Sequence, residues 1–167
     1  LAFTNNSFSS VIWRFNFIKP RLSCCAIYIC NFLIVMSNFL KKEYFLINDI
    51  FCCNINDKST QKVTNFYKET PFPNYKENDD LVSILEKGNK NILAYQFKKF
   101  IGLKKKVLEV GCGTGQLANY FSIGTNNQIV GLDPTIYSLK LAKRFADQNN
   151  IFNISFINAD IFDDVLV

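Results

Sequence analysis

The chain has 167 residues, 49% of them hydrophobic and 20% charged, with a formal net charge of +5 at pH 7. It contains no histidine, which excludes histidine-based catalysis and zinc sites of mixed cysteine and histidine ligation within this chain. The six cysteines include no C-x-x-C pair, and we therefore expect free thiols in the cytoplasm. Most lysines are scattered singly, so the charge indicates neither a nucleic-acid partner nor a membrane surface.

Residues 1–35 form a leader region without a clear helical or strand period, and the single methionine of the chain is Met36. One interpretation takes Met36 as the true start and residues 1–35 as translated non-coding sequence. The other takes the apolar segment Leu22–Leu40 as a membrane anchor, although Asn31 and Asn38 interrupt it and a spanning helix needs about 20 mostly apolar residues. We favour the first interpretation and expect no membrane association.

The next region, residues 36–78, is expected to be an irregular linker. Its second half is polar and contains Pro71 and Pro73, which favour extended or irregular backbone.

A helical lead-in is predicted over residues 79–105. Asn78 can cap a helix that runs from about residue 79 to 101 and ends at Gly102, and Gly88 can divide this helix in two. Such a helix is expected to bury its apolar positions, which are Leu81, Ile84, Leu85, Ile92 and Phe100.

The most informative segment is 107–118, where an apolar strand leads into a glycine-rich turn and then a helix. Gly111, Gly113 and Gly115 alternate with other residues in the turn, and Cys112 is expected only to line it. Glycine adopts positive φ easily and lets a ligand approach the backbone without meeting a Cβ. Because the unpaired N–H groups at the start of the helix point toward the turn, this arrangement predicts a nucleotide-type binding site.

The identity of the ligand is indicated by Glu109 and by the glycine spacing. A dinucleotide fingerprint reads G-x-G-x-x-G/A, whereas here Gln116 stands where its last glycine or alanine would fall. The carboxylate of Glu109 would repel a diphosphate but attract an ammonium or sulfonium group. S-adenosyl-L-methionine carries both of these cations and no phosphate, so the residues favour it over NAD.

Two more acidic residues follow predicted strands. Residues 128–132 form a short apolar strand that ends at Asp133, which is at the distance from the glycines where a carboxylate reaches the ribose hydroxyls. Since Pro134 suits the first helical position, Asp133 could also be a helix cap. Residues 154–159 form a third strand followed by Asp160, which could accept a hydrogen bond from an adenine amino group.

The helices between these strands are amphipathic, and strand and helix alternate from residue 106 onward. This order predicts an α/β fold with a parallel β-α-β-α-β sheet and right-handed crossovers. The apolar faces of the two helices are expected to be formed by Leu117, Tyr120 and Phe121, and by Leu139, Ala142, Phe145 and Ala146.

These motifs resemble those of the class I, Rossmann-like, S-adenosylmethionine-dependent methyltransferases. Val107–Gly115 resembles the first motif of that family, Val130–Asp133 the second and Asn158–Ile161 the third. The resemblance implies that the chain binds S-adenosylmethionine and belongs to an enzyme that transfers its methyl group. The match extends over roughly residues 106–164.

The resemblance also implies a role for each cofactor-binding residue. Glu109 would lie near the amino group, Asp133, with Pro134 beside it, would bind the ribose diol, and Asp160 with the backbone of Ile161 would hold the adenine. The floor under the methionine part would be formed by the turn residues Gly111, Cys112, Gly113 and Gly115.

Upstream, Phe66–Tyr75 resembles a lead-in found before some bacterial methyltransferase domains of this kind. Tyr67, Phe72 and Tyr75 are candidates for a lid over the cofactor, and they serve equally well as core aromatics.

Few residues follow Asp160, so residues 106–167 are expected to be a partial methyltransferase domain, truncated at its C-terminus. The substrate pocket and any catalytic base would then lie outside the chain, which alone should be inactive and only marginally stable. The methyl acceptor stays open among small molecules, proteins, lipids and RNA, and we favour a small molecule. The alternatives are a nucleotide-binding oxidoreductase with an atypical glycine turn and a non-catalytic gene fragment.

Overall fold

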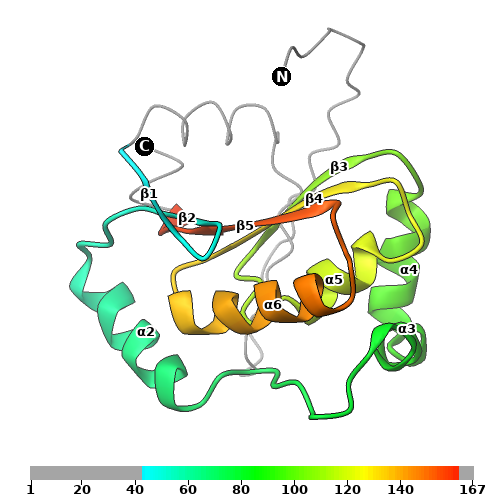
Figure 1. The fold of residues 1–167 in the computed structure, drawn as a ribbon, viewed down its shortest axis with the longest axis horizontal. Helices are drawn as coiled ribbons and strands as arrows, with labels where there is room; N and C mark the ends of the chain where they lie inside the picture. Colours follow the sequence, from blue (N-terminus) through cyan, green and yellow to red (C-terminus); the bar gives the residue numbers. More distant parts are fainter. Residues whose placement is uncertain (1–42, 162–167) are drawn as a thin grey trace, which may run out of the picture.

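The computed structural model describes residues 43–161, and its centre is a twisted parallel sheet (Figure 1). Strand β3 (Lys106–Val110) leads through helix α5 (Gln116–Ser122) to β4 (Gln128–Asp133), and helix α6 (Ile136–Gln148) leads on to β5 (Ile154–Asn158). Strands β3 and β4 pair in parallel, as do β4 and β5. The predicted β-α-β-α-β arrangement is therefore confirmed.

A short hairpin adds two strands to this sheet. It consists of β1 (Phe45–Ile47) and β2 (Ile50–Cys52), and β2 pairs in parallel with β5, which gives the strand order β1-β2-β5-β4-β3. Asn48 and Asp49 form the two-residue turn with positive φ angles of 50° and 60°, as the favoured hairpin turns require. This hairpin lies in the region expected to be irregular, and that expectation is wrong for these residues.

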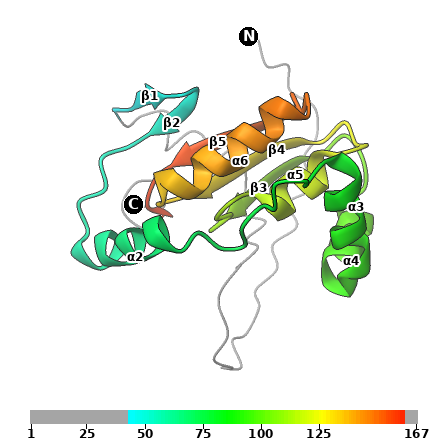
Figure 2. The ribbon, with the colours of Figure 1, turned by 60° about the horizontal axis from the view of Figure 1, so that its bottom comes forward.

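Helix α2 (Lys58–Glu69) also lies in the expected linker. The side chain of Asp57 accepts a hydrogen bond from the backbone N–H of Thr60 and so caps the helix. The segment from Thr70 to Asp80 contains neither helix nor strand, in agreement with the effect expected of Pro71 and Pro73. Figure 2 shows this segment running from α2, past the edge of α6, to α3.

The helical lead-in consists of two helices, α3 (Leu81–Lys90) and α4 (Ile92–Ile101). Asp80, not Asn78, caps α3, because its carboxylate accepts from the backbone of Ser83 while Ser83 accepts from the backbone of Asp80. The division falls at Asn91 and not at Gly88, since the Asn91 side chain caps α4 by accepting from Ala94.

The break changes which residues of the lead-in are buried. Ile84 is buried and Leu81 and Leu85 pack against the core, as expected. Ile92 and Phe100 are 71% and 57% exposed, which contradicts the prediction. Because α4 starts in a new direction after Asn91, other residues face the core in their place, namely Ala94 and Ile101. Gly102 ends α4, as predicted.

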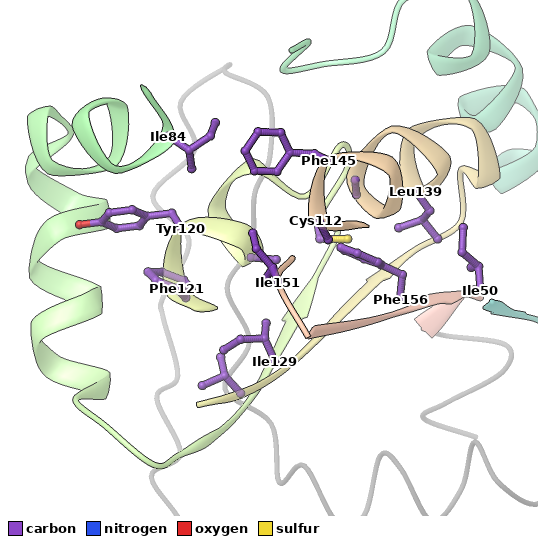
Figure 3. Close-up of a cluster of buried hydrophobic side chains, with 14 of the residues drawn as sticks. Ile50, Ile84, Cys112, Tyr120, Phe121, Ile129, Leu139, Phe145, Ile151 and Phe156 are labelled. Carbon is purple, nitrogen blue, oxygen red and sulfur yellow. The ribbon is translucent and has the colours of Figure 1, made fainter. Parts of the chain in front are cut away.

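The core between the sheet and helices α5 and α6 is formed by alternate strand residues (Figure 3). Ile129 and Phe156 point from the sheet toward Tyr120, Leu139 and Phe145 of the two helices. The predicted apolar faces of both helices are buried, with Leu117 only partly so. Packing of this kind fixes where each strand ends, and these ends position the candidate site.

Within residues 43–161, none of the helices combines the length and the apolar character needed to span a membrane. The two interpretations of the leader, including the anchor at Leu22–Leu40, fall outside the described residues.

Candidate functional site

The turn after β3 has the left-handed backbone that its glycines predicted. The φ angles are 70° at Gly111, 53° at Gly113 and 69° at Gly115. The N–H groups of Gly111 and Cys112 both donate to the carbonyl oxygen of Leu132, at 2.8 and 3.1 Å. The turn is therefore attached to the end of the neighbouring strand β4.

Glu109 is the unusual residue of the site. It is only 1% exposed, and neither of its carboxylate oxygens has a hydrogen-bond partner among the described residues. Burial, together with the nearby carboxylate of Asp133, raises the pKa of Glu109 to about 8. A buried carboxylate without a partner costs free energy that a positively charged ligand would offset.

Asp133 ties the glycine turn to β4. One carboxylate oxygen accepts from the N–H of Gly113 at 2.8 Å, and the other accepts from the N–H of Thr135 at 2.7 Å. Burial raises the pKa of Asp133, while these two hydrogen bonds act in the opposite direction. Each oxygen keeps a lone pair that could accept a hydrogen bond from a hydroxyl group of a ligand.

The helix after Asp133 starts later than the sequence indicates. Thr135 is its N-cap and Ile136 its first residue, so Pro134 precedes the helix and does not occupy the first helical position. Asp133 accepts from the backbone of the capping residue, not from the first turn of the helix, and thus it is not the cap.

Asp160 is buried beyond the end of β5, where it accepts a hydrogen bond from the hydroxyl of Thr60 in α2. No pattern in the sequence indicated that α2 would lie here. The neighbouring strands are joined at the same edge, because the side chain of Asn158 donates to the carbonyl of Asp133 at 3.0 Å. The structure thus brings the ends of β3, β4 and β5, with their three carboxylates, to one edge of the sheet.

A segment that the sequence suggested as a lid lies against the glycine turn. We call residues 71–75, which cross the turn and the start of α5, the strap. A Cβ on Gly113 would stand 2.8 Å from the carbonyl oxygen of Phe72, and the hydroxyl of Thr114 donates to the carbonyl of Pro73. The side chain of Gln116 donates to the carbonyl of Asn74 at 3.0 Å.

Tyr75 fastens the end of the strap. Its hydroxyl accepts from the side chain of Asn119 at 2.9 Å, and its ring stacks on Phe145 with the centroids 4.6 Å apart. Burial raises the pKa of Tyr75. Tyr75 is thus a core aromatic, whereas the side chain of Phe72 is exposed and its contact with the turn is made by its backbone.

The opposite side of the turn is open at Gly111, where an added Cβ would meet no atom within 4 Å. A ligand at this edge could place a cation near Glu109 and hydroxyl groups near Asp133. A surface hollow of about 500 Å³ lies elsewhere, between the β1–β2 turn and the outer face of α6, and none of the expected site residues lines it. No group of three or more possible metal ligands gathers within the described part of the chain.

Comparison with known proteins finds similar sequences and structures. A family model described as a methyltransferase domain matches residues 102–166. A candidate protein N5-glutamine methyltransferase from Methanocaldococcus jannaschii is 42% identical over 69 residues, which are 41% of this chain and 34% of that protein. The chain therefore spans about a third of the length of this curated relative.

Two solved structures are also similar. Magnesium protoporphyrin IX methyltransferase from Synechocystis PCC 6803, solved with bound S-adenosylmethionine, is 15% identical, with a TM-score of 0.46 over 66% of this chain and 59% of that one. The cyclase SpnF is 18% identical, with a TM-score of 0.45 over 62% of this chain and 44% of that one. Residues 102–166 of this chain are therefore similar in sequence to a methyltransferase domain.

Proposed function

We propose that this chain binds S-adenosylmethionine at the carboxyl edge of β3, β4 and β5, and that the protein uses it as a methyl donor. The observation that carries the proposal is the buried carboxylate of Glu109, which has no hydrogen-bond partner among the described residues and stands beside the glycine turn. The ammonium group of the cofactor would supply the missing partner. The reaction we propose is methyl transfer, because residues 102–166 match a methyltransferase domain.

The remaining parts of the cofactor have plausible partners along the same edge. The methionine part would lie over Gly111, where the turn is open. The ribose hydroxyls would use the free lone pairs of Asp133, and the adenine would lie near Asp160 and the backbone of Ile161. Pro134 would line this surface without accepting a hydrogen bond from the cofactor. The side chain of Cys112 is buried in the core, so only its backbone could border the cofactor.

The methyl acceptor and the cellular location belong to the same proposal. We propose a small-molecule acceptor, with a glutamine side chain of a protein as the alternative that the name of the archaeal relative raises. A cytoplasmic location fits Cys52 of the described region, whose thiol is buried and forms no disulfide.

Titration calorimetry of the full chain with S-adenosylmethionine and with NAD tests the ligand. We expect binding of S-adenosylmethionine and none of NAD, because a diphosphate would lie beside the carboxylates of Glu109 and Asp133. Binding of NAD without binding of S-adenosylmethionine would favour the oxidoreductase. A folded chain that binds neither ligand would contradict the proposal for this site.

The role of Asp133 can be tested by substitution. Asp133→Ala should weaken cofactor binding by about 1.5–3 kcal/mol, the scale of hydrogen bonds to a charged group. It should also loosen the glycine turn, because the N–H of Gly113 loses its acceptor. Asp133→Asn should lose less, since its carbonyl oxygen keeps one of the two backbone hydrogen bonds.

Calorimetry measures the affinities of both variants, and circular dichroism verifies that they are folded. If both folded variants bind S-adenosylmethionine like the unmodified chain, Asp133 only holds the turn.

A further inference from the structure

Helix α2 brings one hydroxyl group to the carboxyl edge of the sheet, that of Thr60. This hydroxyl donates to Oδ2 of Asp160, a residue one hundred positions later in the chain. Thr60 is half-buried and Asp160 is only 6% exposed, so the contact is largely shielded from water. Because water competes little for such a contact, a hydrogen bond to a carboxylate is strong there.

The position of Thr60 is fixed by contacts on both sides of the start of α2. Its backbone N–H donates to the carboxylate of Asp57, the N-cap of the helix, at 2.6 Å. Upstream, the N–H of Cys53 donates to the carbonyl oxygen of Asn158 at 2.9 Å, which continues the pairing of β2 with β5. Only residues 54–57 connect this pairing to the first residue of α2. The start of the helix is therefore placed beside the carboxyl end of β5.

We propose that Thr60 is a positioning residue that makes the cofactor site select adenine. This inference rests on the proposed function, in which the adenine of S-adenosylmethionine lies near Asp160. The hydroxyl of Thr60 binds Oδ2 and so fixes the rotation of the Asp160 carboxylate about its Cβ–Cγ bond. The direction from which this carboxylate accepts a further donor is then fixed as well. Thr60 thus acts through Asp160 and not by touching the cofactor.

A carboxylate with a fixed orientation distinguishes purines by the group at C6. An ionised carboxylate can only accept hydrogen bonds. Adenine carries an amino group at C6, which donates, whereas hypoxanthine carries a carbonyl group there, which also accepts. Hypoxanthine therefore loses a hydrogen bond and places an oxygen against the carboxylate. A carboxylate that can rotate avoids this contact by turning away from the carbonyl or toward the N1–H group of hypoxanthine. The hydroxyl of Thr60 prevents that rotation and increases the penalty on hypoxanthine.

Titration calorimetry of the full chain with two ligands tests the selection. The ligands are S-adenosylhomocysteine and S-inosylhomocysteine, which differ only in carrying adenine or hypoxanthine. We expect the unmodified chain to prefer the adenine ligand. Thr60→Val, which replaces the hydroxyl by a methyl group, should reduce this preference about tenfold, mostly through weaker binding of the adenine ligand. Thr60→Ser should restore the preference, because serine keeps the hydroxyl.

The ratio of the two affinities separates positioning from a purely structural role. If Thr60→Val only loosened the fold, both ligands would lose affinity by the same factor, because both depend on the same competent fraction of the protein. The ratio would then stay unchanged. Thr64→Val is the matched control, since the hydroxyl of Thr64 donates to the carbonyl of Gln61 within α2. This control should keep the preference of the unmodified chain.

A double substitution tests whether Thr60 acts through Asp160. Asp160→Ala should by itself reduce the preference, and Thr60→Val added to it should cause no further reduction. An unchanged preference in Thr60→Val, or a further loss in the double variant, would overturn the inference. If the unmodified chain binds both ligands equally, the selection of adenine fails while the proposed function stands. If it binds neither of them, the proposed function fails and this inference fails with it.

Discussion

Replacing Glu109 with glutamine should weaken the binding of S-adenosylmethionine about 10- to 100-fold at pH 8.5, the effect of losing one charged hydrogen bond. The same substitution should make the cofactor-free protein more stable at this pH. Both effects have one cause. The carboxylate is buried without a partner, so its charge opposes folding and favours a cation.

The effect on stability depends on pH in a defined direction. The pKa of Glu109 is about 8 in the folded protein, against a usual value of 4.5. Between pH 4.5 and pH 8, Glu109 is therefore protonated in the folded state and ionised in the unfolded state. Its contribution to the stability of the fold is complete below pH 4.5 and disappears as the pH rises to 8. The free energy of unfolding should fall by up to about 5 kcal/mol over this interval.

Cofactor affinity should change in the opposite direction. Because the ammonium group of the cofactor requires the carboxylate form of Glu109, affinity should rise with pH up to about 8 and then level off. Calorimetry at pH 7 in buffers of different ionisation enthalpy would detect the release of about one proton for each cofactor bound.

Glu109→Gln should remove both pH dependences. Glu86→Gln is the matched control, since Glu86 is exposed in α3 and forms an ion pair with Lys90 of the same helix. If Glu109→Gln binds the cofactor with unchanged affinity and unchanged pH dependence, Glu109 does not contact the ammonium group.

Alanine at Gly113 should destabilise the protein more than alanine at Gly111, although both glycines have positive φ. The left-handed backbone alone costs about 1–2 kcal/mol at either position. At Gly113 the new Cβ would also stand 2.8 Å from the carbonyl oxygen of Phe72, which must move. We therefore expect Gly113→Ala to displace the strap and to lower the thermal midpoint clearly further than Gly111→Ala.

The order should reverse when binding is compared among folded proteins. A methyl group on Gly111 would project into the open side of the turn, where we place the methionine part of the cofactor. Gly111→Ala should thus lose more than about tenfold in affinity, the scale of one or two kcal/mol, with only a modest change in stability. Thermal melts and calorimetry on both variants separate the two effects. Full cofactor affinity in Gly111→Ala would place the ligand elsewhere.

The central part of the fold could be predicted from the sequence because its signals are local and strong. The apolar run before Gly111 and the buried faces of α5 and α6 have the periods of a strand and of helices. The positive φ angles in the turn follow from glycine itself. Whether the candidate residues bind the cofactor stays a prediction.

The remaining part depends on contacts that no local pattern contains. Strands β1 and β2 have three residues each, and β2 is fixed by its pairing with β5, about a hundred residues later. Helix α2 has no buried residue, so it lacks the buried face by which a helix is recognised. The strap is held largely through its own backbone carbonyls, which accept from Thr114 and Gln116 whatever its side chains are.

The strap also bears on how the molecule can be divided. The family model begins at residue 102, yet the glycine turn is held by a segment about thirty residues upstream, and the hydroxyl that reaches Asp160 comes from Thr60. A piece cut at the family boundary would therefore keep the recognisable motifs and lose part of the framework around them. A fragment made for expression or grafting should therefore start before the hairpin β1–β2. The segment that the family model recognises begins later in the chain than the segment that must fold together.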